Sequence, residues 1–137
     1  MSVSVFLAVL FLASALAAPA IAEEASDQLA GYSVTITAMG SGNVRVVVSV
    51  FGTHNQMTKI GFPSVILYES TNNGTTWRGV EAHSGKYNPN VPAGSYSFTF
   101  TYKGVAGRKY SAYSSFYAQD SLGNDTKSAD SPVITAS

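Results

Sequence analysis

An alternation of period two between apolar and polar side chains is the feature that most limits how this chain can fold. It is clearest over residues 95–102 and recurs with valine at every second position over residues 44–50. Such alternation is typical of strands with one buried face, and no helical periodicity follows residue 22. We therefore predict an all-β chain. The apolar positions of 95–102, which we expect in the core, are Tyr96, Phe98, Phe100 and Tyr102.

Seven segments of strand character are separated by turn signals rich in glycine, asparagine and proline. They cover residues 31–38, 44–51, 59–70, 77–83, 95–102, 108–120 and 126–137. Short strands at this spacing predict an antiparallel β-sandwich of about seven strands. Pro63 interrupts the third segment, and because proline cannot donate to a ladder we expect a bulge or an edge position there.

The segment from Val65 to Trp77 combines an apolar strand, a polar turn and an aromatic residue that re-enters a strand. Asn73-Gly74 is a strong hairpin signal, because both residue types accept the positive φ angles of a type I′ turn. We expect Gly74 to have a positive φ and Trp77 to fold its ring over the turn. Both residues are predicted to be structural.

The pattern Ser70-x-Asn72-x-Gly74-x-Thr76-Trp77 resembles the Asp-box, a hairpin repeated in sialidase propellers, with Asn in place of Asp. In that family the motif is a structural turn remote from catalysis, so the resemblance implies a rigid hairpin and no sialidase activity. A propeller requires several four-stranded blades, which this chain is too short to form.

Residues 1–22 form an apolar segment without any charge, and Ala20-Ile21-Ala22 fits the small-x-small rule for signal-peptide cleavage. We predict a secretory signal peptide over 1–22, a polar lead-in over 23–30 and a single β-sandwich domain over 31–137. An uncleaved membrane anchor is the alternative, because the segment has no Lys or Arg at its start and is just long enough to span a bilayer. After cleavage no transmembrane segment is expected, and the protein is predicted to be secreted or at the cell surface.

The charged residues are balanced and scattered, with eight basic and eight acidic side chains and a net charge of zero. A nucleic-acid surface requires a basic patch, so no nucleic-acid partner is expected. The chain has no cysteine, which excludes a lipoprotein anchor and disulfides. The layout of a signal segment and one cysteine-free domain resembles small secreted proteins of Gram-positive bacteria that have no assigned activity.

The segment from Val105 to Tyr110 resembles the corner of a fibronectin type III or related immunoglobulin-like domain, where a tyrosine opens the penultimate strand. The continuation Phe116-x-Ala118-x-Asp120-x-x-Gly123-Asn124 is similar to the end of that strand and its turn. The resemblance implies that Tyr110 is the tyrosine of the corner, with its hydroxyl bonded to nearby backbone. This strand is longer than the usual spacing, and the Trp is not in the early core strand.

The sequence shows no recognisable catalytic set, and none is predicted. Glu81 and His83 share a strand face as a potential acid–imidazole pair, while Glu69 and Glu81 are expected to lie on the surface. No metal site or cofactor is expected. The weak calcium candidates are Asp120, Asn124 and Asp125, whose oxygens occur close together at one turn.

Tyr113 and Tyr117 are the candidate ligand-binding residues, because they point outward if Tyr110 and Phe116 point inward. Exposed tyrosines on one strand offer a platform for sugar rings or for a partner protein. The favoured function is a secreted, non-enzymatic binding, adhesion or structural surface protein. The alternatives are a carbohydrate-binding module and a small hydrolase, and the expected partner is a polysaccharide or a protein surface.

Overall fold

The structure, a computed structural model, describes residues 26–137, and within this range the chain forms eight strands and no helix. It follows that none of these residues belongs to a helix able to cross a membrane. The predicted signal segment lies outside the described residues. The strands are β1 (Leu29–Gly40), β2 (Asn43–Gly52), β3 (Lys59–Ser70), β4 (Arg78–Tyr87), β5 (Ser95–Lys103), β6 (Lys109–Asp120), β7 (Gly123–Asp130) and β8 (Ile134–Thr135).

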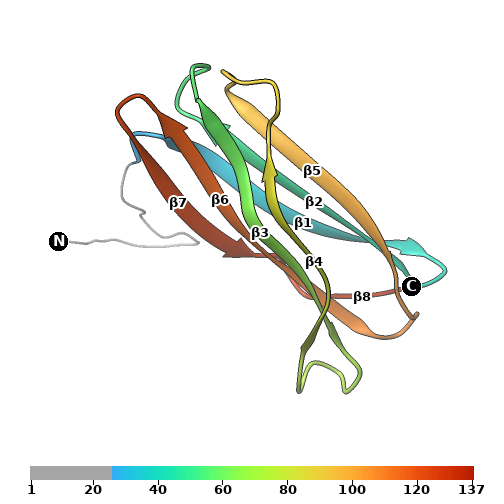
Figure 1. Cartoon of the computed structure of the whole chain (residues 1–137). Helices are drawn as coiled ribbons and strands as arrows, with labels where there is room; N and C mark the ends of the chain where they lie inside the picture. The colour runs from blue at the N-terminus through green and yellow to red at the C-terminus, as the bar shows by residue number, and fades with distance from the viewer. Residues whose placement is uncertain (1–25) are drawn as a thin grey trace, which may run out of the picture.

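The strands form two antiparallel sheets packed face to face, which confirms the predicted β-sandwich (Figure 1). One sheet has the order β1-β2-β5, and the other has the order β4-β3-β6-β7 with β8 also paired to β6. Eight strands form where seven were expected, because the last predicted segment is divided. Pro132 lies between β7 and β8, and a proline cannot donate to a ladder.

The core lies between the sheets and follows the predicted alternation. The four alternate valines of β2, from Val44 to Val50, are fully buried against β3 and β6. Of the aromatic residues of β5, Phe100 is buried, while Tyr96, Phe98 and Tyr102 are partly buried and pack against the core. The reason is that β5 is the edge strand of its sheet, so its side chains have neighbours on one side only.

A β-bulge at Pro63 allows a proline in a central strand. Gly61 pairs with Tyr117, whereas Val65 pairs with Ser114, so β3 has one extra residue in this interval. The backbone N–H of Ser64 donates to the Ser115 hydroxyl at 2.9 Å, which satisfies the donor that the ladder leaves out.

Candidate functional site

The turn between β3 and β4 lies at the lower end of the molecule in Figure 1, and Trp77 is its last residue before β4 begins. Asn73 and Gly74 have φ angles of 61° and 90°, as in a type I′ turn. The Ser70 hydroxyl accepts from the Gly74 N–H at 2.8 Å, and the Asn72 side-chain oxygen accepts from the Thr76 N–H at 2.9 Å. The side chains of the motif therefore replace the ladder hydrogen bonds that end at Ser70.

A hollow of about 430 Å³ opens beside Trp77 on the outer face of the five-stranded sheet. Trp77 and Tyr68 supply aromatic rings, and Trp77 keeps 37% of its surface exposed. The ring lies beside Gly74 in the hairpin and also presents part of its surface to the solvent. The other lining residues are Ser111 on β6, Asp130 at the end of β7, and Ser131 and Val133 in the segment before β8.

A second, smaller hollow of about 80 Å³ also has Trp77 in its lining, together with Glu69, Thr71, Thr76 and Arg78. Trp77 therefore takes part in the lining of both hollows. They differ in chemistry, because the large one carries two aromatic rings, hydroxyl groups and the carboxylate of Asp130, whereas the small one carries two threonines and the guanidinium of Arg78 paired with the carboxylate of Glu69.

Glu69 is buried beneath the small hollow, which is contrary to the expected surface position. Its Oε1 atom accepts from Arg78 Nη2 at 3.0 Å and from Arg108 Nη1 at 3.4 Å, and its Oε2 atom accepts from the Tyr110 hydroxyl at 2.6 Å. These partners lie up to 41 residues away in the sequence. Buried carboxylates are rare unless paired, and this one has cations and a hydroxyl around it.

Electrostatics keep Glu69 ionised. Burial alone would raise the pKa of Glu69, but the hydrogen bonds from Tyr110 and Arg78 and the charge of Arg108 outweigh it, so this pKa is lowered. Burial and the bond to Glu69 raise the pKa of Tyr110. The Tyr110 hydroxyl also accepts from the Val105 N–H at 3.0 Å, so it ties the corner before β6 to the carboxylate.

Tyr113 and Tyr117 lie on the outer face of the five-stranded sheet and are half-buried. Tyr113 pairs with Asp130, so it adjoins the large hollow. Tyr117 lies further along β6, where its ring meets Tyr87 edge-on with centroids 6.2 Å apart and Lys59 lies near both rings. The two predicted residues thus occupy separate parts of one face, and only Tyr113 is close to the hollow.

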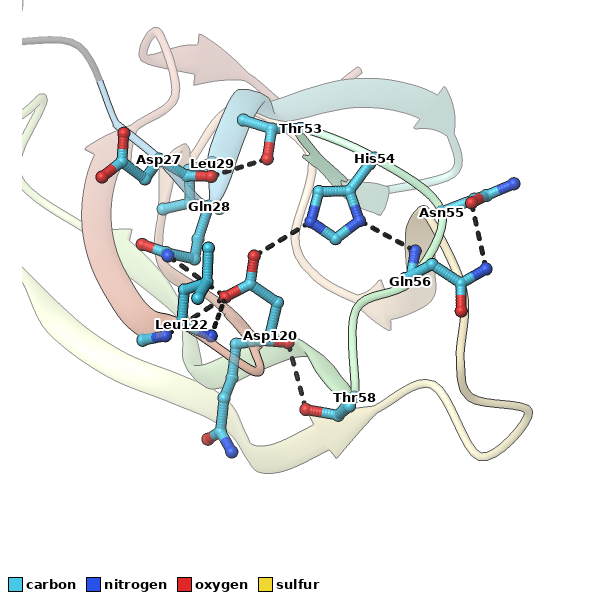
Figure 2. Close-up of polar contacts among 12 residues, drawn as sticks. Asp27, Gln28, Leu29, Thr53, His54, Asn55, Gln56, Thr58, Asp120 and Leu122 are labelled. Atoms are coloured by element: carbon cyan, nitrogen blue, oxygen red, sulfur yellow. Dashed lines mark hydrogen bonds and ion pairs between the residues drawn. The ribbon is translucent and has the colours of Figure 1, made fainter.

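Asp120 lies at the opposite end of β6 and forms hydrogen bonds to three segments: the residues before β1, the loop after β2 and the turn before β7 (Figure 2). Its Oδ2 atom accepts from His54 Nε2 at 2.9 Å, and its Oδ1 atom accepts from Gln28 Nε2 and from the backbone of Leu122 and Gly123. The bond from His54, followed by the bond from the Leu122 N–H, lowers the pKa of Asp120.

The predicted calcium candidates do not converge on one point. The oxygens of Asp120 are engaged as described, while Asp125 accepts from the Thr126 N–H at 2.8 Å. Asn124 lies on the outer side of β7 opposite Gln119. Across residues 26–137, no three histidine or acidic side chains are grouped so that they could hold a metal ion.

Glu81 and His83 do form the pair expected from their spacing. His83 Nε2 and Glu81 Oε2 are 2.6 Å apart, at the rim of the core. The imidazole ring packs on Phe98 and Phe100, with centroids 5.0 Å and 4.6 Å away, and so closes the gap between the β4 and β5 edges. This packing gives the imidazole a structural role between the two sheets.

Sequence reasoning missed four residues that shape the site: Tyr68, Glu69, Arg78 and Asp130. Three of them, Tyr68, Glu69 and Arg78, flank the turn in the sequence, and their closeness to Trp77 in the chain could have indicated a shared site. Asp130 comes from the end of β7, and only the pairing of β6 with β3 and β7 brings it near Tyr68.

Comparisons with known proteins do not identify a family for this chain. No protein family and no curated sequence matches the chain. A solved structure that matches is a variant of superoxide reductase (neelaredoxin) from Archaeoglobus fulgidus in its reduced form. The two are 16% identical, the match covers 80% of this chain and 95% of that one, and the TM-score is 0.44.

This match corrects two predictions made from the sequence. The chain was expected to be a non-enzymatic binding, adhesion or structural protein and not an enzyme, whereas the matching structure is that of an enzyme. Both predictions rested on the fold and on the lack of a recognisable catalytic set, and a sandwich fold does not specify function. We withdraw them. The likeness is too distant to transfer an activity or a metal to this chain.

Proposed function

We propose that the large hollow beside Trp77 is a binding site for the sugar rings of a polysaccharide. The observation that carries this proposal is the pairing of two aromatic side chains, Trp77 and Tyr68, with hydrogen-bonding groups around one open hollow. The proposal defines what the site binds. An enzyme that acts on a polysaccharide requires such a site just as a binding protein does.

The lining has the two kinds of group that a pyranose ring requires. Aromatic faces pack on the C–H face of a sugar, and carboxylates and hydroxyls bond to its equatorial hydroxyls. Asp130 and Ser111 supply the polar groups. Asp130 forms no ion pair within residues 26–137, and the Ser111 hydroxyl, which donates to the Ser131 carbonyl at 3.3 Å, can still accept a hydrogen bond. The volume of about 430 Å³ is within the range of small-molecule sites.

The aromatic surface continues beyond the hollow, which favours a chain of sugars over a single one. Tyr113 adjoins Asp130, and Tyr117 with Tyr87 forms a further platform on the same face. From Ser111 to Tyr117 the strand advances by about 20 Å, at roughly 3.4 Å per residue. Ser128 on β7 is exposed and Ser64 on β3 is half-buried in this region, so serines accompany the aromatic rings.

Binding of the protein to a panel of polysaccharides by isothermal titration and by affinity electrophoresis tests the proposal. Trp77→Ala should weaken binding by about fivefold to 150-fold, if a sugar ring stacked on the indole contributes about 1–3 kcal/mol as a stacked base does. Tyr68→Ala should have a smaller effect in the same direction. Since Trp77 is 37% exposed, its removal should lower the free energy of unfolding by less than the about 3 kcal/mol typical of core aromatics.

Phe51→Ala is the matched control. Phe51 is 49% exposed on the three-stranded sheet, so its substitution removes a comparable ring from the other face of the molecule. Its binding should equal that of the parent. Failure of the parent to bind any polysaccharide, or equal losses in the Trp77 and Phe51 variants, would contradict the proposal.

We further infer that the protein is exported and that its sandwich is of the fibronectin type III kind. Two observations support the second inference: β1-β2-β5 and β3-β6-β7 correspond to the A-B-E and C-F-G groupings of such domains, and the Tyr110 hydroxyl bonds to the backbone of Val105. The inference of export rests on the apolar segment ending in Ala20-Ile21-Ala22. N-terminal sequencing of secreted material should begin at or near Glu23, and an intact Met1 form in membranes would contradict it.

A further inference from the structure

We infer that the sugar bound at Trp77 carries a carboxylate, which the Arg78 guanidinium receives in the small hollow. This inference rests on the proposed function, since it assigns the chemical class of the ligand at the same site. It requires a ring that stacks on the indole and a charged substituent that extends past it. Uronic acid units of acidic polysaccharides have this composition.

The first step in the argument is the excess of positive charge around the hairpin. Arg78 and Arg108 share the single carboxylate of Glu69, and both bond to the same oxygen, Oε1. The stem of Lys109 lies near the same turn, while its ammonium donates to the Thr135 hydroxyl at 3.0 Å. Two guanidinium groups therefore share one buried anion, which leaves this cluster with an excess of one positive charge although the whole chain is neutral.

The second step is the exposure of Arg78. Its side chain is 67% exposed although it bonds to a carboxylate that is only 1% exposed. Its Nε and Nη2 atoms are directed to Glu69 Oε1 at 3.3 Å and 3.0 Å. A guanidinium has five N–H donors, so donors remain for a second carboxylate at the surface. Its planar fork matches that group better than an ammonium does.

The third step is the position of the two hollows. Both include Trp77, but Arg78 lines only the small hollow and Asp130 only the large one. Glu69 also lines the small hollow, but its charge is already paired with Arg78 and Arg108, and the carboxylate of Asp130 belongs to the other hollow. The volume of about 80 Å³ accommodates a carboxylate and one or two waters, since a water occupies about 30 Å³. Thr71 and Thr76 line the same hollow and offer hydroxyl groups to the anion.

The test compares carboxylated oligosaccharides with the same oligosaccharides after methyl esterification, which removes the charge and keeps the ring. The probes are oligogalacturonate, oligomannuronate and hyaluronan oligomers, with a neutral panel of cello-, xylo- and manno-oligosaccharides. We expect at least one acidic probe to bind about tenfold more tightly than its ester, as for one charge-assisted hydrogen bond. This preference should decline as salt is raised, because exposed charges are screened.

Arg78→Gln should remove the preference for acid over ester, and Arg78→Lys should restore part of it. Arg45→Gln is the matched control, since Arg45 is exposed on the three-stranded sheet. Melting curves identify any loss of folding, and Arg78→Lys keeps the charge on Glu69 paired.

Equal affinity for acid and ester, or a preference that survives Arg78→Gln in a folded protein, would overturn the carboxylate inference while the sugar site stands. Loss of acid binding in Arg45→Gln would also overturn it. If the parent binds neither the acidic nor the neutral panel, the sugar site itself is overturned.

Discussion

A buried carboxylate lies near each end of β6: Glu69 beside its first residues and Asp120 at its last. The two carboxylates differ in the groups that donate to them. Asp120 and Glu69 each accept four hydrogen bonds from the chain. The donors at Asp120 are an imidazole, an amide and two backbone N–H groups. Those at Glu69 are two guanidinium groups and a phenol.

This difference decides whether charge and hydrogen-bond donors remain unengaged at each end of β6. His54 Nδ1 accepts from the Gln56 N–H at 3.1 Å, so the geometry assigns the ring proton to Nε2 and a neutral imidazole (Figure 2). The Asp120 cluster thereby connects β6 to the 52–58 loop and to the residues before β1. At Glu69 the two arginines exceed the carboxylate in charge, both reach the surface, and Arg78 lines the small hollow. A polar cluster is a candidate binding site when it has more hydrogen-bond donors than its own acceptors can engage.

The largest expected effect is that of removing the Glu69 carboxylate. Glu69→Ala should lower the free energy of unfolding by about 3–5 kcal/mol, because the buried Tyr110 hydroxyl and two arginines lose their partner. Urea unfolding measures the change. Asp120→Ala should cost less, since its partners are neutral and His54 is partly exposed. Equal losses in the two variants would remove the distinction between the two ends.

The hairpin should respond next. Gly74→Val places a β-branched side chain at a φ of 90° and should lower the free energy of unfolding by about 1–3 kcal/mol. Gly79→Val is the control, because Gly79 is not among the glycines of positive φ and a Cβ there meets its nearest neighbour at 3.6 Å. If both variants melt alike, backbone strain at Gly74 is not the cause.

Acid should weaken the Asp120 end. The pKa of Asp120 is lowered below its ordinary value of 3.8, so its stabilisation is present above 3.8 and is lost as the pH falls through the lower, folded-state value. Urea unfolding at a series of pH values should therefore show a declining stability below about pH 4. Asp120→Asn should flatten this decline, and an unchanged slope in that variant would assign the acid response to other carboxylates such as Glu69.

The smallest expected effect is that of Asn72→Asp, which restores the usual residue of the Asp-box. The carboxylate oxygen can still accept from the Thr76 N–H, and the Thr76 hydroxyl can donate in place of the Asn72 amide. We expect a change within about 0.5 kcal/mol in the free energy of unfolding. A larger loss by thermal melting would show that the Asn72 amide N–H is required.

The parts of this molecule that the sequence predicts are those with local causes. The period-two valines of β2 and the positive φ angles at Asn73-Gly74 depend on neighbours a few residues away, and both occur as expected. The bulge at Pro63 follows equally from the missing N–H of one residue. In each case the physical constraint is contained in the segment itself.

The candidate site depends on contacts across the sequence. Glu69 is buried because Tyr110 and Arg108 reach it from 41 and 39 residues away, and Tyr68 shares a hollow with Asp130 because β6 lies between their strands. The partial exposure of Tyr96 and Phe98 has the same origin, since alternation identifies a buried face and not an edge strand. Strand order, which period-two patterns do not encode, is the information that was missing.

Trp77 is the single tryptophan of the chain, and it takes part in the lining of both hollows. Excitation near 295 nm therefore selects one indole whose emission depends on the occupancy of this one place. Because the ring is 37% exposed, it is accessible to collisional quenchers such as acrylamide or iodide in the unliganded protein. A molecule stacked on it would shield the ring and shift its emission to shorter wavelength, so the protein carries its own optical probe of the site.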